Sequence, residues 1–119
     1  MSTPLLLRGG TLVDPKAGTV RTGDLFIRNG RIETPPATPP IDTQLVDAKG
    51  LTVVPGLIDI PVHLREPGNE QAETIETGCR AAARGGFTTV VAMPNTQPPL
   101  DSPKLVAQVI ATAEKLGLA

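Results

Sequence analysis

Short apolar runs separated by turn-forming residues fill the first half of the chain. One pair of runs flanks Asn29-Gly30, a dipeptide that favours the two-residue turn of a β-hairpin because both positions take positive φ. Four prolines within 34–41 predict a surface loop, because they remove backbone donors and favour extended geometry. The pattern predicts a small β-sandwich-like domain over residues 1–54, built of short antiparallel strands at 5–7, 11–13, 25–28, 31–33, 45–47 and 51–54.

The second half of the chain has strand and helix patterns in alternation. A nearly continuous apolar run at 57–62 is typical of a parallel strand buried on both faces, and β-branched residues predict a second strand at 87–93. Apolar residues at helical spacing predict one helix over 71–84 and another that begins after Ser102. This order predicts two parallel strands joined by a right-handed crossover, so the fold class is α/β.

Both predicted helices carry signals at their ends. Gly85-Gly86 is typical of a left-handed carboxy-terminal cap, whereas Ser102 is a good N-cap with Pro103 at the first helical position. The apolar residues of each helix fall on one face, which we expect to be buried. These residues are Ile75, Cys79, Ala82 and Ala83 in the first helix, and Leu105, Val106, Val109, Ile110, Ala113 and Leu116 in the second.

Polar residues crowd the carboxyl ends of the two predicted parallel strands. His63, Arg65 and Glu66 follow the first strand, and Asn95 follows the second. Ligands bind at this edge in α/β sheets and barrels, and adjacent strands lie about 4.8 Å apart, so side chains beyond both strands can reach one small molecule. An arginine guanidinium fits a carboxylate bidentately, and an asparagine amide can contact a neighbouring polar edge.

Each of these residues also has an ordinary structural interpretation. His63 is compatible with a strand-end histidine whose hydrogen bonds are satisfied, and Arg65 with a solvated surface charge. Asn95 is equally able to cap a turn. Asp59, inside the first strand, is a candidate for a hydrogen bond that supports the site, and Cys79 is predicted to lie in the core.

The run from Pro55 to Gly68, PGLIDIPVHLREPG, resembles the first barrel strand of dihydroorotases, which are zinc hydrolases of the amidohydrolase superfamily. The family pattern is Asp-x-His-x-His-Leu-Arg-x-Pro-Gly, and Pro61 departs from it at the first of two zinc-binding histidines. Hydantoinases and allantoinases share the strand pattern, but the Leu-Arg-Glu-Pro-Gly and Met-Pro-Asn-Thr runs are more specific to dihydroorotases. The resemblance continues through ETIETG, GGFTTVVAMPNT and PPLDSP, and therefore spans essentially the whole chain.

This resemblance implies a fold, a reaction and roles for three residues. Residues 55–119 correspond to the first two βα units of an amidohydrolase TIM-type barrel, which is incomplete because a whole barrel takes about 250 residues. The implied reaction is the reversible hydrolysis of the cyclic amide of dihydroorotate to carbamoyl aspartate in pyrimidine biosynthesis. Arg65 and Asn95 are the implied substrate-binding residues, and His63 is the implied zinc ligand.

The departures from the family pattern lead to further expectations. Because Pro61 replaces one ligand and the remaining ligands of the family lie on later strands, we expect the chain alone to be truncated and inactive, with no catalytic residue of its own. One alternative is a non-catalytic homologue that acts as a structural or regulatory partner of aspartate carbamoyltransferase. Another is that a second polypeptide, or a homo-oligomer, covers the unpaired strand edges.

Composition and charge narrow the range of partners. The formal charge of −1, from 11 basic and 12 acidic residues, together with the absence of Trp and Tyr, argues against a nucleic-acid partner. No apolar run approaches the roughly 18 residues of a membrane span, and the amino terminus has no signal-peptide pattern. Cys79 is the single cysteine, which excludes an intramolecular disulfide and favours a cytoplasmic location.

Overall fold

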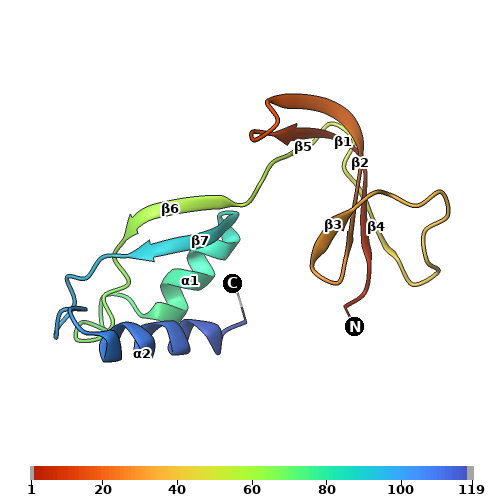
Figure 1. The fold of residues 1–119 in the computed structure, drawn as a ribbon. Helices are drawn as coiled ribbons and strands as arrows, with labels where there is room; N and C mark the ends of the chain where they lie inside the picture. The colour runs from red at the N-terminus through yellow and green to blue at the C-terminus, as the bar shows by residue number, and fades with distance from the viewer. Residues whose placement is uncertain (1, 118–119) are drawn as a thin grey trace. The chain divides into compact units, whose positions relative to one another are not determined.

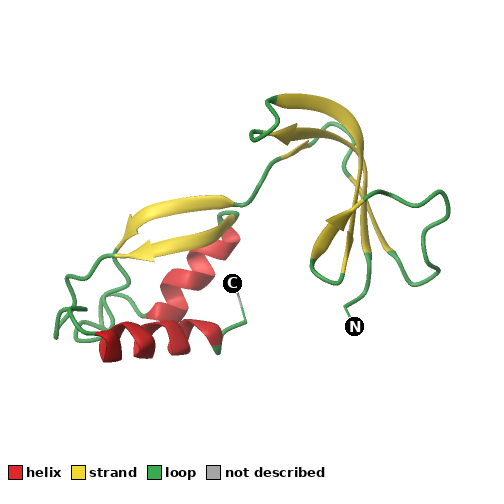
Figure 2. Ribbon diagram, viewed as in Figure 1, coloured by secondary structure: helices red, strands yellow, loops and turns green. Residues whose placement is uncertain are grey.

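The computed structural model describes residues 2–117 and divides the chain into two compact units. The amino-terminal unit ends at Pro55 and the carboxy-terminal unit begins at Gly56. Strands form the regular structure of the first unit, whereas the second unit combines two strands with two helices (Figures 1 and 2).

The amino-terminal unit is one five-stranded mixed sheet in the order β3-β2-β1-β4, with β5 also paired to β1. The long strand β1 is antiparallel to β2, and β2 is antiparallel to β3. Buried side chains of Leu6, Leu12, Phe26 and Ala48 form its core. The strands are β1 (Leu5–Asp14), β2 (Thr19–Arg28), β3 (Arg31–Glu33), β4 (Gln44–Asp47) and β5 (Thr52–Val53).

The predicted hairpin at Asn29-Gly30 is confirmed. Arg28 of β2 pairs directly with Arg31 of β3, so the connecting loop has two residues. Asn29 and Gly30 have φ angles of 51° and 72°, as the tight turn requires. Here a local conformational demand, which is readable from two residues, decided the pairing of two strands.

Two details of the predicted sheet are wrong. Residues 5–7 and 11–13 belong to the single strand β1, because Gly9 at φ 70° produces an irregularity within the strand instead of a turn. The strands β4 and β5 run parallel to β1, not antiparallel. The reason is that residues 34–43 return the chain to the starting end of β1, where the Gln44 N–H donates to the Pro4 carbonyl over 2.8 Å.

The carboxy-terminal unit has the predicted strand–helix–strand–helix order. Its strands are parallel, which confirms the predicted crossover, and α1 packs on β7 and against α2. Leu64 and Ile75 are its buried apolar side chains. The elements are β6 (Leu57–Val62), α1 (Ile75–Arg84), β7 (Phe87–Ala92) and α2 (Pro103–Glu114).

The helix α1 begins four residues later than predicted. The Thr74 side chain accepts a hydrogen bond from the Thr77 N–H over 3.1 Å, and the Thr77 hydroxyl accepts one from the Thr74 N–H over 3.0 Å. This reciprocal capping box sets the start of the helix at Ile75, which is also the first apolar residue of the predicted buried face. The other ends agree with prediction, since Gly86 at φ 84° follows α1 and Ser102 caps α2.

The expected burial of β6 on both faces is wrong for the described residues. Leu57, Ile58 and Ile60 are 46%, 62% and 66% exposed. The reason is that β6 contacts β7 and no other helix or strand within residues 2–117, so no second layer covers it. In α2, Val106 and Ile110 of the predicted buried face are also exposed.

Pro61 lies at an irregularity of β6. Asp59 pairs with Val90 and Val62 pairs with Ala92, so β6 has one more residue than β7 between these two pairs. A bulge of this kind tolerates proline because the residue there does not need to donate a ladder hydrogen bond. Pro61 is therefore accommodated without loss of the parallel pairing that follows it.

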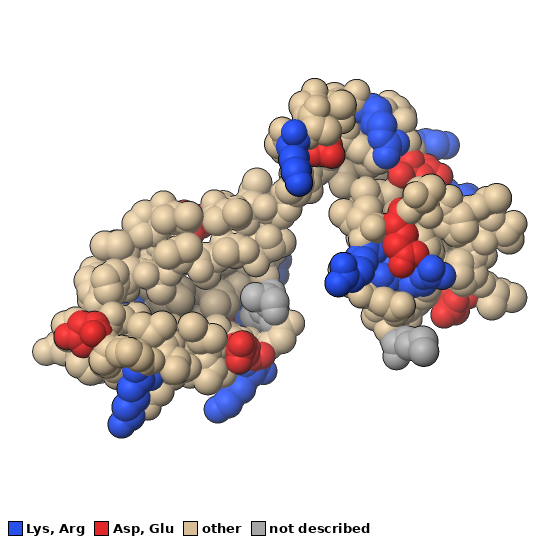
Figure 3. Space-filling view, viewed as in Figure 1, with Lys and Arg blue, Asp and Glu red and all other residues tan. Residues whose placement is uncertain are grey.

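The surface charge of each unit is mixed, and the helices are short or polar. Lys and Arg side chains alternate with Asp and Glu over each unit on the face shown in Figure 3, so neither unit presents a surface of one sign in that view. Among the described residues, the helices are too short or too polar to cross a membrane.

Candidate functional site

The loops that follow β6 and β7 come together at one edge of the parallel strand pair. The Met93 N–H donates to the Val62 carbonyl over 2.8 Å, which continues the ladder beyond the strands. Further out, the Gln97 N–H donates to the Pro67 carbonyl over 2.9 Å. These backbone hydrogen bonds fix residues 63–69 against residues 93–99, as the parallel arrangement predicts.

Gly68 allows the two loops to approach so closely. Its φ angle is 104°, and a Cβ atom at this position would overlap the Gln97 carbonyl oxygen and lie 2.8 Å from the Gln97 Cβ. The Gly68 N–H donates to the Glu70 carboxylate over 2.8 Å, and this hydrogen bond lowers the pKa of Glu70. The loop that carries Arg65 is thus held in place by backbone contacts and by one carboxylate.

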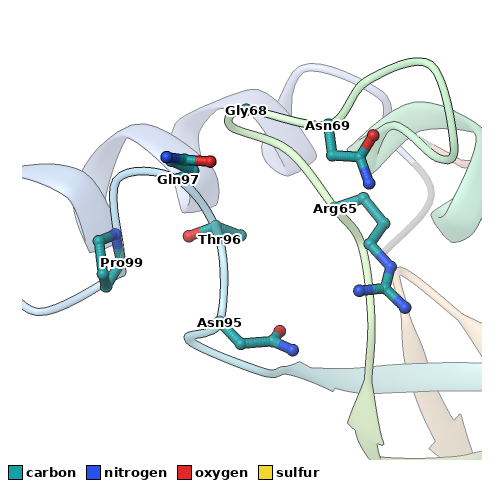
Figure 4. Close-up of a pocket in the computed structure, with 7 residues that line it drawn as sticks. All are labelled: Arg65, Gly68, Asn69, Asn95, Thr96, Gln97 and Pro99. Atoms are coloured by element: carbon teal, nitrogen blue, oxygen red, sulfur yellow. The ribbon is translucent and has the colours of Figure 1, made fainter.

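A pocket of about 350 Å³ lies between these two loops. Figure 4 shows that the Asn95 carboxamide extends toward the loop that carries Arg65. Arg65 has a φ angle of 61°, an uncommon value for a residue with a side chain. The lining residues are Arg65, Gly68, Asn69, Asn95, Thr96, Gln97 and Pro99, and several of their side chains carry N–H donors.

Arg65 and Asn95, the two predicted substrate-binding residues, therefore line the same pocket. His63 lies beside them, with its Nδ1 atom 3.3 Å from the Asn95 Oδ1 atom. It also lines a separate pocket of about 250 Å³ together with Asp59 and residues of α1. The structure brings the three predicted residues into one neighbourhood, but His63 belongs to the side nearer the helix.

The residues present do not fit a zinc site. Among residues 2–117, no three His, Cys, Asp or Glu side chains are grouped so that they could hold a metal ion. Pro61, which stands where the family pattern has a histidine, offers no side-chain donor, and zinc sites take three or four protein ligands. The prediction that His63 binds zinc stays a prediction.

Glu66 has a structural contact instead of facing the pocket. Its carboxylate accepts a hydrogen bond from the Ile75 N–H over 2.8 Å, at the first residue of α1. An anion at this position satisfies a free N–H group and interacts favourably with the helix dipole. Of the polar residues after β6, Arg65 is therefore the one that lines the pocket with Asn95.

Sequence reasoning missed Asn69, Thr96 and Gln97 as lining residues. Their sequence positions could have identified them as lining residues, because Asn69 directly follows the Pro67-Gly68 turn and the other two directly follow Asn95. What could not be read from the sequence was the distance between the loops, which depends on the Gln97–Pro67 hydrogen bond.

The sequence is similar to those of known proteins over most of its length. Residues 50–115 match the family described as Dihydro-orotase-like. The dihydroorotase of Pelotomaculum thermopropionicum is 51% identical over 112 residues, which cover 93% of this chain and 26% of that protein. The dihydroorotase of Aquifex aeolicus is 41% identical over 115 residues, 96% of this chain and 27% of that protein.

A solved structure has the same fold. The L-hydantoinase (dihydropyrimidinase) from Arthrobacter aurescens superposes with a TM-score of 0.76 at 23% identity, over 92% of this chain and 24% of that one. The match confirms the predicted fold class, a small β domain followed by the first βα units of a barrel. The chain spans about a quarter of the length of the relatives it matches.

Proposed function

Because the chain belongs to the dihydroorotase-like family, we propose that it supplies the substrate-carboxylate site of a cyclic amide hydrolase. The observation that carries this proposal is the pocket shared by Arg65 and Asn95. The ligand would be dihydroorotate or carbamoyl aspartate, as the names of the relatives suggest. The reaction would be the addition of water across the ring amide, which breaks a C–N bond and is reversible, as a step of pyrimidine biosynthesis.

The chemistry of the pocket suits an anion. The Arg65 guanidinium can donate two parallel hydrogen bonds to one carboxylate, and hydrogen bonds between ionised groups are the stronger ones. Asn95 adds a neutral amide from the neighbouring strand end. Two loops that are tied by backbone hydrogen bonds would hold both groups in place before the ligand binds, which reduces the entropic cost of binding.

We propose that residues 2–117 bind the substrate without hydrolysing it. Metal-assisted attack on an amide needs a set of ligands that the described residues do not provide. Adding L-dihydroorotate and zinc to the purified chain should therefore give no carbamoyl aspartate. Turnover that a chelator abolishes would contradict this division of roles.

The binding proposal is tested by titrating the 119-residue chain with L-dihydroorotate and, separately, with dihydrouracil, the same ring without the carboxylate. Backbone amide shifts in 1H–15N spectra report binding at residues 63–69 and 93–99. We expect dihydroorotate to bind at least about tenfold more tightly, because a charge-assisted contact contributes about 1.5–3 kcal/mol.

The variant Arg65→Asn should abolish this preference for the carboxylate. Asparagine is suitable here because it tolerates the left-handed backbone at this position. The control is Lys104→Asn, which removes one positive charge from the exposed surface of α2. Equal affinity for the two rings, or an effect of Lys104→Asn as large as that of Arg65→Asn, would refute the proposal.

A second candidate function is favoured by Pro61 alone. A homologue that lacks a metal ligand at this position would act as a structural or regulatory partner, for example of aspartate carbamoyltransferase, or would assemble with copies of itself. Co-purification of the chain with that transferase at a fixed stoichiometry supports this function. A chain that stays alone at micromolar concentration contradicts it.

A further inference from the structure

We propose that His63 is a positioning residue, which orients the Asn95 carboxamide so that its N–H groups face the ligand pocket. The inference deepens the proposed function, since it concerns the same carboxylate site. It starts from the contact between His63 Nδ1 and Asn95 Oδ1, which are 3.3 Å apart. It assigns to the sole histidine of the chain a role that does not require a metal ion.

The proposed role requires a proton on one particular ring nitrogen of His63. A carboxamide oxygen only accepts hydrogen bonds, so the Nδ1 atom that faces it must be the donor. In the proposed arrangement His63 is the Nδ1–H form, and its Nε2 atom is the free acceptor. The arrangement is maintained by the backbone, because the Met93 N–H donates to the Val62 carbonyl immediately before both side chains.

The orientation of Asn95 decides whether the pocket favours an anion. With its oxygen occupied by His63, the Asn95 amide nitrogen is free to donate beside the Arg65 guanidinium. In the opposite orientation, the oxygen would face the pocket and repel a ligand carboxylate. The tautomer of His63 thus determines whether the second polar group of the pocket is a donor or an acceptor.

The positioning role of His63 does not depend on a metal ion. Pro61, two residues earlier, has no side-chain donor, and no group of three ligand side chains exists among the described residues. The contact of His63 with Asn95 is the side-chain hydrogen bond that joins the ends of β6 and β7 in this part of the structure. A histidine without a metal site can therefore still determine how a ligand is recognised.

The first test uses the unliganded chain labelled with 15N. His63 gives the only imidazole signals, because the chain has one histidine. Long-range 1H–15N spectra at about pH 8 should show the proton on Nδ1 in the wild type and a shift toward the Nε2–H form in Asn95→Ala. A wild-type Nε2–H form, or a pattern that Asn95→Ala does not alter, overturns the proposal.

The second test compares two replacements of His63. His63→Asn places an amide N–H where Nδ1 stands, whereas His63→Gln extends the donor toward the position of Nε2. We expect dihydroorotate to bind His63→Asn within about twofold of the wild type and His63→Gln about fivefold more weakly. Equal affinities in the two variants overturn the proposal.

Zinc provides the third arm. One equivalent of zinc chloride should leave the proton on Nδ1, because a metal ion could reach only the free Nε2 atom. Loss of the Nδ1–H signal when zinc is added overturns the positioning role. The proposed function fails separately, if dihydroorotate and dihydrouracil bind equally. The tautomer of the unliganded chain is independent of that result, so the two failures are distinguishable.

Discussion

Replacement of Gly68 by alanine should separate the two loops that form the pocket. In the folded chain, Gly68 has a φ angle of 104° and lies directly against Gln97. A Cβ atom would overlap the Gln97 carbonyl oxygen and lie 2.9 Å from its carbonyl carbon. Both neighbours belong to the backbone or its first side-chain atom, so neither can move aside by rotating a flexible side chain.

Two costs add up at this position. The left-handed backbone costs a residue with a Cβ atom about 1–2 kcal/mol. The overlap with Gln97 adds roughly 1–3 kcal/mol, the usual range for inserting a methyl group into a filled space. We therefore expect Gly68→Ala to lower the free energy of unfolding of the carboxy-terminal unit by about 2–5 kcal/mol.

Urea denaturation followed by circular dichroism at the helical minimum measures this change. The signal reports on the unit that contains Gly68, because α1 and α2 both belong to it. Fluorescence is unsuitable, since the chain has no Trp or Tyr. The matched control is Gly86→Ala in the same unit, where φ is 84° but no atom lies within 4 Å of the place that the added methyl group would take.

The control isolates the close approach from the backbone strain. Gly86→Ala should show only the strain of about 1–2 kcal/mol, so the difference between the variants measures the contact with Gln97. In addition, Gly68→Ala should weaken dihydroorotate binding because the loops that carry Arg65 and Asn95 move apart. Equal destabilisation by the two variants would refute the reasoning.

Two further predictions concern α1. Glu66→Ala removes the acceptor of the Ile75 N–H and should destabilise the unit by about 0.5–2 kcal/mol. Glu76→Ala, which breaks an exposed ion pair with Arg80, should cost about 0.3–0.5 kcal/mol, and urea denaturation measures both changes. Equal costs would argue against capping by Glu66. Cys79 is only partly buried and does not lie in the core as predicted. This partial burial raises the pKa of its thiol, so iodoacetamide should label it more slowly at pH 9 than in the urea-unfolded chain, and stability should fall as the pH rises through the raised pKa. Labelling at equal rates would contradict that burial.

Local signals in the sequence were sufficient for the ends and turns of several elements. The Asn29-Gly30 turn, the glycine end of α1 and the Ser102 cap of α2 are each defined by one or two residues whose conformational or hydrogen-bonding needs have few solutions. The parallel pairing of β6 with β7 followed from the helix-length connection between them. The resemblance to dihydroorotases likewise depended on short runs of residues.

Long-range contacts decided the features that the sequence left open. The direction of β4 and β5 depends on where the loop at residues 34–43 returns the chain, and the exposure of β6 depends on which elements cover it. Neither is encoded by residue spacing, because both are properties of segments that are distant in the sequence.

The candidate site shows the same division. The sequence alone determined that His63, Arg65 and Asn95 follow two parallel strands, since that placement needs only the strand ends. Tertiary structure decided that Glu66 caps a helix, that His63 contacts Asn95 and that Gly68 meets Gln97. These outcomes depend on distances of a few ångströms between loops, which are set by packing and backbone hydrogen bonds and not by the identity of neighbouring residues.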